Sequence, residues 1–171
     1  PAEQLARMAF IPEEGSGFPQ MSPYEYARFL ADFYGGFRME RFRELLTFFG
    51  LPMHDKIKTF SKGQRSKLEV CAGFSKGASY ILMDEPFIGK DWFTRREFLR
   101  LMIDSLHEDE TILISTHLID EIEPVLDRAV ILHHGRIKAM FTIDEMREAG
   151  ENLSDRLASA AGMAAGSVGF P

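Results

Sequence analysis

"YILMDEP", residues 80–86, is the stretch that decides the fold class. Four apolar residues run directly into two carboxylates, Asp84 and Glu85, and a proline follows. A continuous apolar run is typical of a strand that is buried on both faces of a parallel sheet. Ligands of open parallel sheets bind beyond the carboxyl ends of the strands. Because an acid pair is costly to bury without a positive partner, this stretch predicts a cation site at the end of a parallel strand.

The segments around this strand alternate between strand and helix patterns. One short apolar strand is expected ahead of it, at 7–11. The patterns after it predict a helix at 92–107, a strand at 111–116, a short helix at 119–126, a strand at 128–133, a hairpin partner at 137–141 and a helix at 142–149. Thr142 and Glu145 have the spacing of a capping box at the start of that last helix. Strands that alternate with helices favour an α/β fold with a parallel sheet.

A small helical unit is predicted between the first two strands, at 17–58. Ser22 and Glu25 have the spacing of a capping box at the start of a helix. The Gly35-Gly36 pair is expected to end that helix. A second helix, with apolar residues at helical spacing, is expected at 38–49.

Composition narrows the classes of function. The formal net charge is −6 and no run of Lys and Arg occurs, which argues against a surface for nucleic acid or for an anionic membrane. The one cysteine, Cys71, excludes an internal disulfide and a cysteine zinc cluster. No apolar run approaches the roughly 20 residues of a transmembrane helix, and no signal peptide is visible. Because the chain begins with Pro1 and not with Met, we expect it to be a piece of a longer protein.

The acid pair is the first candidate ligand site. Magnesium is the expected cation for Asp84, because it binds carboxylates together with substrate phosphates. Glu85 could then polarise a water molecule for attack on phosphorus. The alternative is that one acid caps the following helix while the other is solvated.

"SKGQRSKLEV", residues 61–70, is the second candidate site. Ser61 and Gln64 have capping-box spacing. Three basic residues lie in and just after the first turn, where the helix dipole disfavours cations: Lys62, Arg65 and Lys67. The pattern favours an anion bound at the free backbone amides, which Gly63 allows to approach closely. An ordinary capped helix with a basic face is the alternative.

Three blocks of the sequence together resemble a known family. They are "FSKGQRSKLEV" at 60–70, "YILMDEPFIGKD" at 80–91 and "ISTHLIDEIEPVLDRAVILHHGRI" at 114–137. In that order they resemble the signature loop, the Walker B strand with its D-loop, and the switch histidine of the ATP-binding subunit of an ABC transporter. The resemblance extends from about residue 7 to residue 147, and it is greatest to the exporter-type subfamily that includes the YtrB-like ATPases.

The resemblance implies ATP and Mg²⁺ as cofactors and assigns roles to single residues. Asp84 would hold Mg²⁺ through water, and His117 would contact the γ-phosphate. Glu85 would be the general base or the carboxylate that positions the attacking water. Asp91 would lie at the seam of a dimer. Glu13 occupies the position where the family has the glutamine of its Q-loop.

The resemblance also implies partners. The signature-loop residues would contact the γ-phosphate of ATP bound to a second ATP-binding subunit: Ser61, Lys62, Gly63 and Gln64. The helical unit would touch an integral membrane permease, which places the protein at the cytoplasmic face of the membrane, and no nucleic-acid partner is expected.

The expected fold class is α/β, an incomplete P-loop NTPase-like parallel sheet with an inserted small helical subdomain. Four segments are expected: a core strand and Q-loop at 1–16, the helical subdomain with the signature loop at 17–72, the C-terminal part of the ATPase core at 73–150, and a loosely structured tail at 151–171.

The chain departs from the family in three places. Phe60 and Lys62 replace the usual leucine and first glycine of the signature loop, and Glu13 replaces a glutamine. The Walker A pattern G-x-x-x-x-G-K-[ST] does not occur in the 171 residues. We therefore expect the C-terminal part of a longer ATPase, inactive alone, whose missing central strand lies beside the strand of Asp84. Apolar strand faces and edges should then be exposed.

Two other readings remain open. A soluble ABC-type ATPase of DNA repair or translation would share the same motifs. A non-catalytic regulatory or interaction domain would account for the absent Walker A pattern. A helicase is disfavoured, because "SKGQ" precedes the acid pair and "STH" follows it.

Overall fold

The computed structural model describes residues 4–5, 7–12, 18–86 and 92–162. It contains two compact units. The first unit comprises Pro1–Trp92 and Ser105–Thr116, and the second comprises Phe93–Asp104 and His117–Pro171. Each unit has a sheet of its own.

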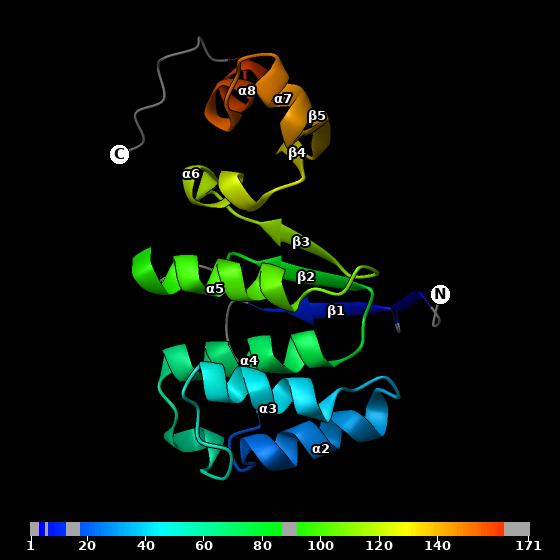
Figure 1. The fold of residues 1–171 in the computed structure, drawn as a ribbon, viewed down its shortest axis with the longest axis vertical. Coiled ribbons are helices and arrows are strands. Elements are labelled where there is room, and N and C mark those ends of the chain that lie inside the picture. The colour runs from blue at the N-terminus through cyan, green and yellow to red at the C-terminus, as the bar shows by residue number, and fades with distance from the viewer. Residues whose placement is uncertain (1–3, 6, 13–17, 87–91, 163–171) are drawn as a thin grey trace. The chain divides into compact units, whose positions relative to one another are not determined.

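The sheet of the first unit is parallel and has the strand order β1-β2-β3 (Figure 1). Its strands are β1 (Met8–Ile11), β2 (Tyr80–Asp84) and β3 (Thr111–Ser115). All three were predicted from the apolar runs of the sequence. The parallel register confirms the α/β class, and it places Asp84 beside Ser115 at the carboxyl ends of β2 and β3.

The central position of β2 corrects one expectation. This strand is hydrogen-bonded to β1 along one edge and to β3 along the other. A further strand therefore cannot pair with β2, and the expectation that a missing strand lies beside the strand of Asp84 is wrong. The order of motifs along the chain does not specify the order of strands, because long-range pairing sets the latter.

The two faces of this sheet differ in burial. One face carries the buried side chains of Ala9, Ile11, Ile81 and Met83. The other carries the exposed side chains of Met8, Phe10, Tyr80 and Leu113. The apolar run in β2 was expected to be buried on both faces. That expectation is wrong, because Tyr80 is 47% exposed and only the face of Ile81 and Met83 is buried. The expected exposure of an apolar strand face is confirmed.

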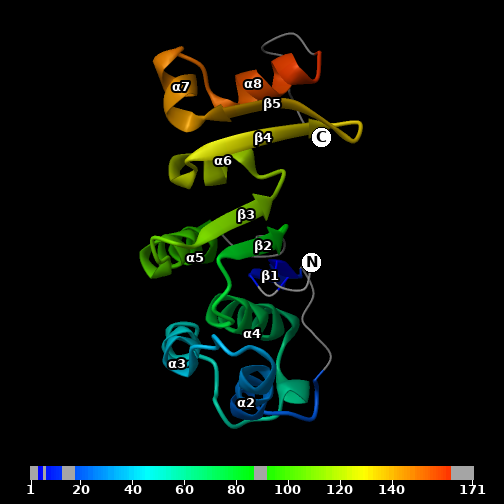
Figure 2. The ribbon, with the colours of Figure 1, turned by 90° about the vertical axis from the view of Figure 1, so that its right-hand side faces the viewer.

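Helix α4 (Lys62–Ser75) packs against β1 at one point of close approach. A Cβ atom at Gly73 would lie 2.3 Å from Cγ1 of Ile11, so only glycine fits there without a shift of the isoleucine. Figure 2 shows α4 next to β1, with the other helices of the unit on its far side.

The helical unit consists of α2 (Pro23–Phe33), α3 (Met39–Phe48), the short 3-10 helix η1 (Ile57–Thr59) and α4. The predicted capping box begins α2: Ser22 Oγ accepts from the Glu25 N–H, and Glu25 Oε2 accepts from the Ser22 N–H at 2.7 Å. The apolar stripes of the helices form the core of this unit, with Tyr26, Leu30, Phe42, Leu45, Leu46 and Leu68 buried.

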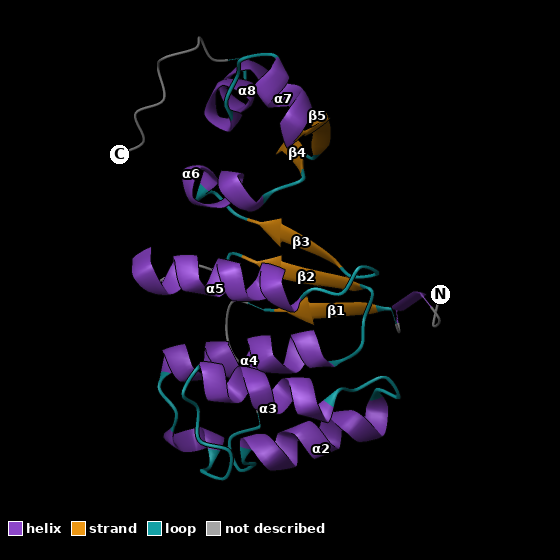
Figure 3. Cartoon of the chain, in the orientation of Figure 1, coloured by secondary structure: helices purple, strands orange, loops and turns teal. Residues whose placement is uncertain are grey.

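The second unit contains the antiparallel pair β4 (Arg128–His133) and β5 (Arg136–Thr142) (Figure 3). Most of α5 (Trp92–Ser105) belongs to this unit. Its other helices are α6 (Ile119–Ile122), α7 (Ile143–Glu148) and α8 (Leu153–Ala160), with the 3-10 helix η2 (Glu123–Val125) after α6. His134 and Gly135 turn the hairpin with positive φ angles of 48° and 71°. The predicted capping box of Thr142 and Glu145 begins α7.

Helix α8 differs from the loose tail expected from residue 151. Asn152 caps it by accepting from the Asp155 N–H at 2.8 Å. Leu153 and Ala158 are buried, and Leu153 belongs to the core cluster built on Ala129, Ile131, Phe141, Ile143 and Met146. The apolar stripe of this helix is hard to recognise in the sequence because many of its residues are small. The helix becomes stable only when that stripe packs against a tertiary partner.

Within the described part of the chain, none of the helices combines the length and the hydrophobicity needed to cross a bilayer.

Candidate functional site

The acid pair lies where the sequence predicted it, at the carboxyl end of β2. Asp84 is the last residue of the strand, and its side chain is exposed. The hydroxyl of Ser115, the last residue of β3, donates a hydrogen bond to Asp84 Oδ1. The carboxylate is therefore not a buried charge, as the cost argument from the sequence assumed, but a solvent-facing group with a neutral hydroxyl partner.

Glu85 follows in a turn with an unusual backbone. Its φ angle is +41°, in the left-handed region that non-glycine residues rarely adopt. Its N–H donates to the Ser115 carbonyl at 2.9 Å, and its side chain is half-buried. Strain of this kind costs on the order of 1–3 kcal/mol and is found most often at functional sites.

The donor set at this edge fits Mg²⁺. Mg²⁺ takes oxygen ligands, and proteins usually supply it with one or two carboxylates while water and substrate phosphates complete the shell. Asp84 and Glu85 are the carboxylates present. Among the described residues no group of three or more His, Cys, Asp and Glu side chains could hold a metal ion.

The second candidate site is the first turn of α4. Ser61 is the N-cap, its Oγ accepts from the Gln64 N–H at 3.2 Å, and Gln64 Oε1 accepts from the Ser61 N–H at 2.9 Å. The predicted capping box is therefore confirmed. Ser61, Lys62 and Gly63 are exposed, so a ligand could approach this turn.

Arg65 and Lys67, two basic residues of this turn, have contacts that connect them to other segments of the chain. Arg65 Nη2 donates to the Lys58 carbonyl at 3.2 Å and so holds η1 in place. Lys67 Nζ lies 5.8 Å from the centroid of the Phe49 ring. Their charges thus have structural partners, which supports the alternative of a basic helix face for these two residues. The role of the turn in binding an anion stays a prediction.

Three further predicted site residues, His117, Glu13 and Asp91, are not tested by the described geometry. His117 belongs to the second unit, where it is exposed and precedes α6. That it meets Asp84 and Glu85 at one phosphate stays a prediction. Glu13 and Asp91 lie outside the described residues.

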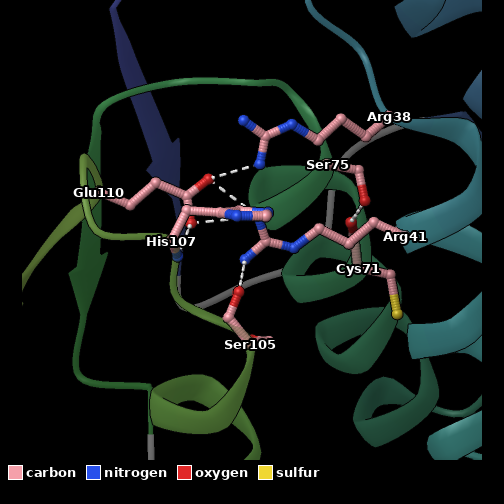
Figure 4. Close-up of polar contacts among 7 residues, drawn as sticks. All are labelled: Arg38, Arg41, Cys71, Ser75, Ser105, His107 and Glu110. Carbon is pink, nitrogen blue, oxygen red and sulfur yellow. Dashed lines mark hydrogen bonds and ion pairs between the residues drawn. The ribbon is translucent and has the colours of Figure 1, made fainter.

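A buried ionic cluster was missed by the sequence analysis (Figure 4). Glu110, whose side chain is 1% exposed, precedes β3. Arg41 Nη1 of α3 donates to its two carboxylate oxygens at 2.8 and 3.1 Å, and Arg38 Nη1 donates to Oε1 at 3.0 Å. Arg41 Nη2 also donates to the Ser105 carbonyl at 2.7 Å, and the His107 N–H donates to Glu110 Oε2 at 3.1 Å.

The environment of Glu110 favours its charged form. Burial raises the pKa of this carboxyl, but hydrogen bonds from Arg41 and from the His107 N–H, together with the charges of Arg41 and Arg38, outweigh burial and hold the pKa below its usual value. One signal was available in the sequence. Arg41 lies four residues before Leu45, on the apolar stripe of its helix, where an arginine needs a buried acid.

Relatives of the chain are found among bacterial ATP-binding proteins. YdbJ, an uncharacterized ABC transporter ATP-binding protein of Bacillus subtilis (strain 168), is 32% identical over 133 residues, which are 75% of this chain and 43% of YdbJ. YtrB, an ABC transporter ATP-binding protein of the same organism, is 27% identical over 140 residues, which are 81% of this chain and 48% of YtrB. No family model matches the chain.

A solved structure described as the ATP binding subunit of an ABC transporter has a TM-score of 0.79 to this chain at 28% identity, over 91% of this chain and 69% of that chain. The chain is a homologue of ABC transporter ATP-binding proteins. The structure of cbiO1 from Clostridium perfringens, part of the ABC transporter complex cbiONQ, shares the fold of this homologue with a TM-score of 0.67 at 18% identity.

The predicted resemblance to YtrB-like ATP-binding proteins is therefore confirmed, and so is the incomplete P-loop NTPase-like fold. This ABC ATP-binding homologue spans a little under half the length of YdbJ and YtrB. Its acid pair at the end of β2 supplies the carboxylates that fit Mg²⁺.

Proposed function

We propose that this chain is part of an ATP-hydrolysing subunit that powers an ABC transporter. The observation that carries the proposal is the acid pair at the carboxyl end of β2, with Asp84 exposed beside Ser115 and Glu85 in a strained turn. Homology to ABC transporter ATP-binding proteins supports ATP as the nucleotide. Mg²⁺, when bound with ATP, neutralises charge that develops on the phosphates.

Each of the predicted site residues has a distinct role in the proposed reaction. Asp84 holds the cation, directly or through water. Glu85 accepts a proton from the attacking water or orients that water, because a carboxylate within hydrogen-bond reach is the usual general base. His117 contacts the terminal phosphate. The turn of Ser61–Gln64 faces the nucleotide of a second ATP-binding subunit, and Asp91 lies at the seam between the two.

The Walker A pattern is absent from the 171 residues, so the cradle for the β- and γ-phosphates comes from polypeptide beyond them in this proposal. Two observations support this. YdbJ and YtrB are about twice as long as the stretch that they share with this chain. The sheet of the first unit exposes an apolar face, which proteins seldom leave in contact with water.

The proposed partner is a membrane permease at the cytoplasmic face. The helical unit has exposed aromatic side chains that suit such a contact, with Phe33 71% and Phe48 49% exposed. A contiguous apolar patch on a surface marks an interaction site, and the proposal takes these two aromatic side chains as part of such a patch. A second ATP-binding subunit, either a like or an unlike chain, completes the proposed complex.

The test measures binding and hydrolysis of ATP by two proteins, the 171-residue chain and the gene product that contains it. We expect Mg-dependent binding and hydrolysis from the gene product only. Glu85→Gln should keep ATP binding and lose ATP hydrolysis. Asp84→Asn should reduce the increase in ATP binding and in ATP hydrolysis that Mg²⁺ produces. Tight Mg-dependent ATP binding by the 171 residues alone would refute the place given to the phosphate cradle.

The absent Walker A pattern favours a second candidate, a regulatory or interaction domain without catalysis. A gene product that lacks the pattern throughout and binds no ATP would establish it. Salt-sensitive binding of nucleic acid would instead favour a soluble ABC-type ATPase, whereas co-purification with a polytopic membrane protein favours the transporter.

A further inference from the structure

Ser115 lies beside the acid pair because of the way β3 joins the sheet. The parallel register pairs Thr111 with Tyr80 at the start of β3 and Ser115 with Asp84 at its end. Both Thr111 and Ser115 are exposed, on the same side of the strand. The strand therefore presents one hydroxyl at each end, and only the second meets a carboxylate of the acid pair.

Ser115 contacts both members of the acid pair, by two different groups. Its hydroxyl donates to Asp84 Oδ1, and its backbone carbonyl accepts from the Glu85 N–H at 2.9 Å. The second contact ties the strained turn at Glu85 to the neighbouring strand. One residue thus restrains the carboxylate of Asp84 and the backbone from which the side chain of Glu85 projects.

The chemistry of this contact suits a carboxylate that must bind a cation. A hydrogen bond to an ionised carboxylate is stronger than one between neutral groups, so it can hold the side chain of Asp84 in one rotamer. A hydroxyl carries no charge, so it leaves the negative charge of Asp84 available. It also engages Oδ1 and leaves Oδ2 to face a ligand. Partners of this kind orient the groups that bind metals and account for much of their affinity.

We propose that Ser115 is a positioning residue for the divalent cation held by Asp84. The inference rests on the proposed function, because it assigns Ser115 to the same cation site. It predicts that the hydroxyl, and not the size or shape of the side chain, is what the site requires.

The experiment uses the gene product that contains this chain, with Mn²⁺ as a spectroscopic substitute for Mg²⁺ and a non-hydrolysable ATP analogue. Electron paramagnetic resonance measures the dissociation constant of Mn²⁺. Ser115→Val and Ser115→Thr form a matched pair of equal shape, and Thr keeps the hydroxyl. Thr111→Val makes the same hydroxyl-to-methyl change at the other end of β3.

We expect Ser115→Val to weaken Mn²⁺ binding about tenfold, the lower end of the usual effect of losing such a partner. Ser115→Thr should stay within about twofold of the native protein, and Thr111→Val should leave the constant unchanged. Equal affinities of Ser115→Val and Ser115→Thr would overturn the inference alone. An equal loss in Thr111→Val would also overturn it, because the effect would then belong to the strand. A native protein without nucleotide-dependent Mn²⁺ binding would instead refute the proposed function together with the inference.

Discussion

Strand β3 has a carboxylate site at each of its ends, and the two sites have opposite surroundings. At its start, Glu110 is buried and receives hydrogen bonds from Arg38 and Arg41. At its end, Ser115 donates to Asp84, which is exposed and has a neutral hydroxyl as its partner. The same sheet thus holds one acid whose charge is compensated inside the fold and one whose charge faces solvent.

The contrast separates structural acids from acids that are available to a ligand. A buried carboxylate is tolerated only with cations and hydrogen bonds around it, and its charge is then compensated within the fold. The charge of an exposed carboxylate is not compensated when its hydrogen-bond partner is a neutral hydroxyl. The position of an acid next to a strand therefore says little about its role until its partners are known.

Removal of Glu110 should have the largest effect on stability. In Glu110→Ala, Arg41 stays buried without its acid, which typically costs about 3–5 kcal/mol. Denaturation by urea, followed by circular dichroism, measures the loss. Asp84→Ala is the control and should change the free energy of unfolding by about 0.5 kcal/mol or less, as surface substitutions do. Equal losses for the two variants would remove the distinction between the sites.

A double replacement should recover much of that loss. In Arg41→Met with Glu110→Leu, neither buried charge remains, and apolar side chains of similar volume occupy the cluster. Such exchanges are often neutral or stabilising. We expect the double variant to be at least about 2 kcal/mol more stable than Glu110→Ala in the same urea experiment. A double variant as unstable as the single one would mean that packing, and not an unpaired charge, causes the loss.

The buried site of Glu110 should also contribute to stability against acid. The pKa of Glu110 is lower in the folded chain than in the unfolded chain, so its stabilising contribution is complete above the unfolded value of about 4.3 and is lost as the pH falls through the folded value. One proton changes stability by at most about 1.4 kcal/mol per pH unit. Urea midpoints between pH 6 and pH 3 should fall less steeply in Glu110→Gln than in the native chain. An unchanged slope in Glu110→Gln would contradict the charged form assigned to Glu110.

Arg38→Ala should have the smallest effect. The side chain of Arg38 is 37% exposed, whereas that of Arg41 is 8% exposed. Water screens the contribution of a partly exposed ion pair, and a loss within about 1 kcal/mol is expected. The measurement is the same urea midpoint, with Arg41→Ala for comparison. A loss in Arg38→Ala as large as that in Arg41→Ala would show that both arginines are needed to compensate Glu110.

The features that were predicted correctly involve residues close together in the chain. The capping boxes of Ser22, Ser61 and Thr142 each join residues three positions apart, and all three are present. The strand that carries Asp84 follows from its apolar run, and its acid pair lies at its carboxyl end as expected. Short-range geometry of this kind depends on the identity of a few neighbouring residues.

The features that were missed join residues that are far apart in the chain. Arg41 and Glu110 are separated by 69 positions, so their pairing cannot be read from local spacing. The order β1-β2-β3 brings together strands from three separate segments. Local spacing does not reveal that β1 and β3 occupy both edges of β2, which is why a strand missing from the chain was wrongly expected beside β2. Helix α8 was missed because its small residues need the core of the second unit to become a stable helix.

For this chain, residue types and their spacing were enough to specify the helix caps, the apolar strands, the α/β class and the acids that follow β2. Packing alone decided which acid is compensated and which is not. The fate of a charge depends on burial and on partners brought in from distant segments, and both arise only when the chain folds. Glu110 and Asp84 lie at opposite ends of the same pair of neighbouring strands, and the tertiary fold gave the first two arginines and the second a serine.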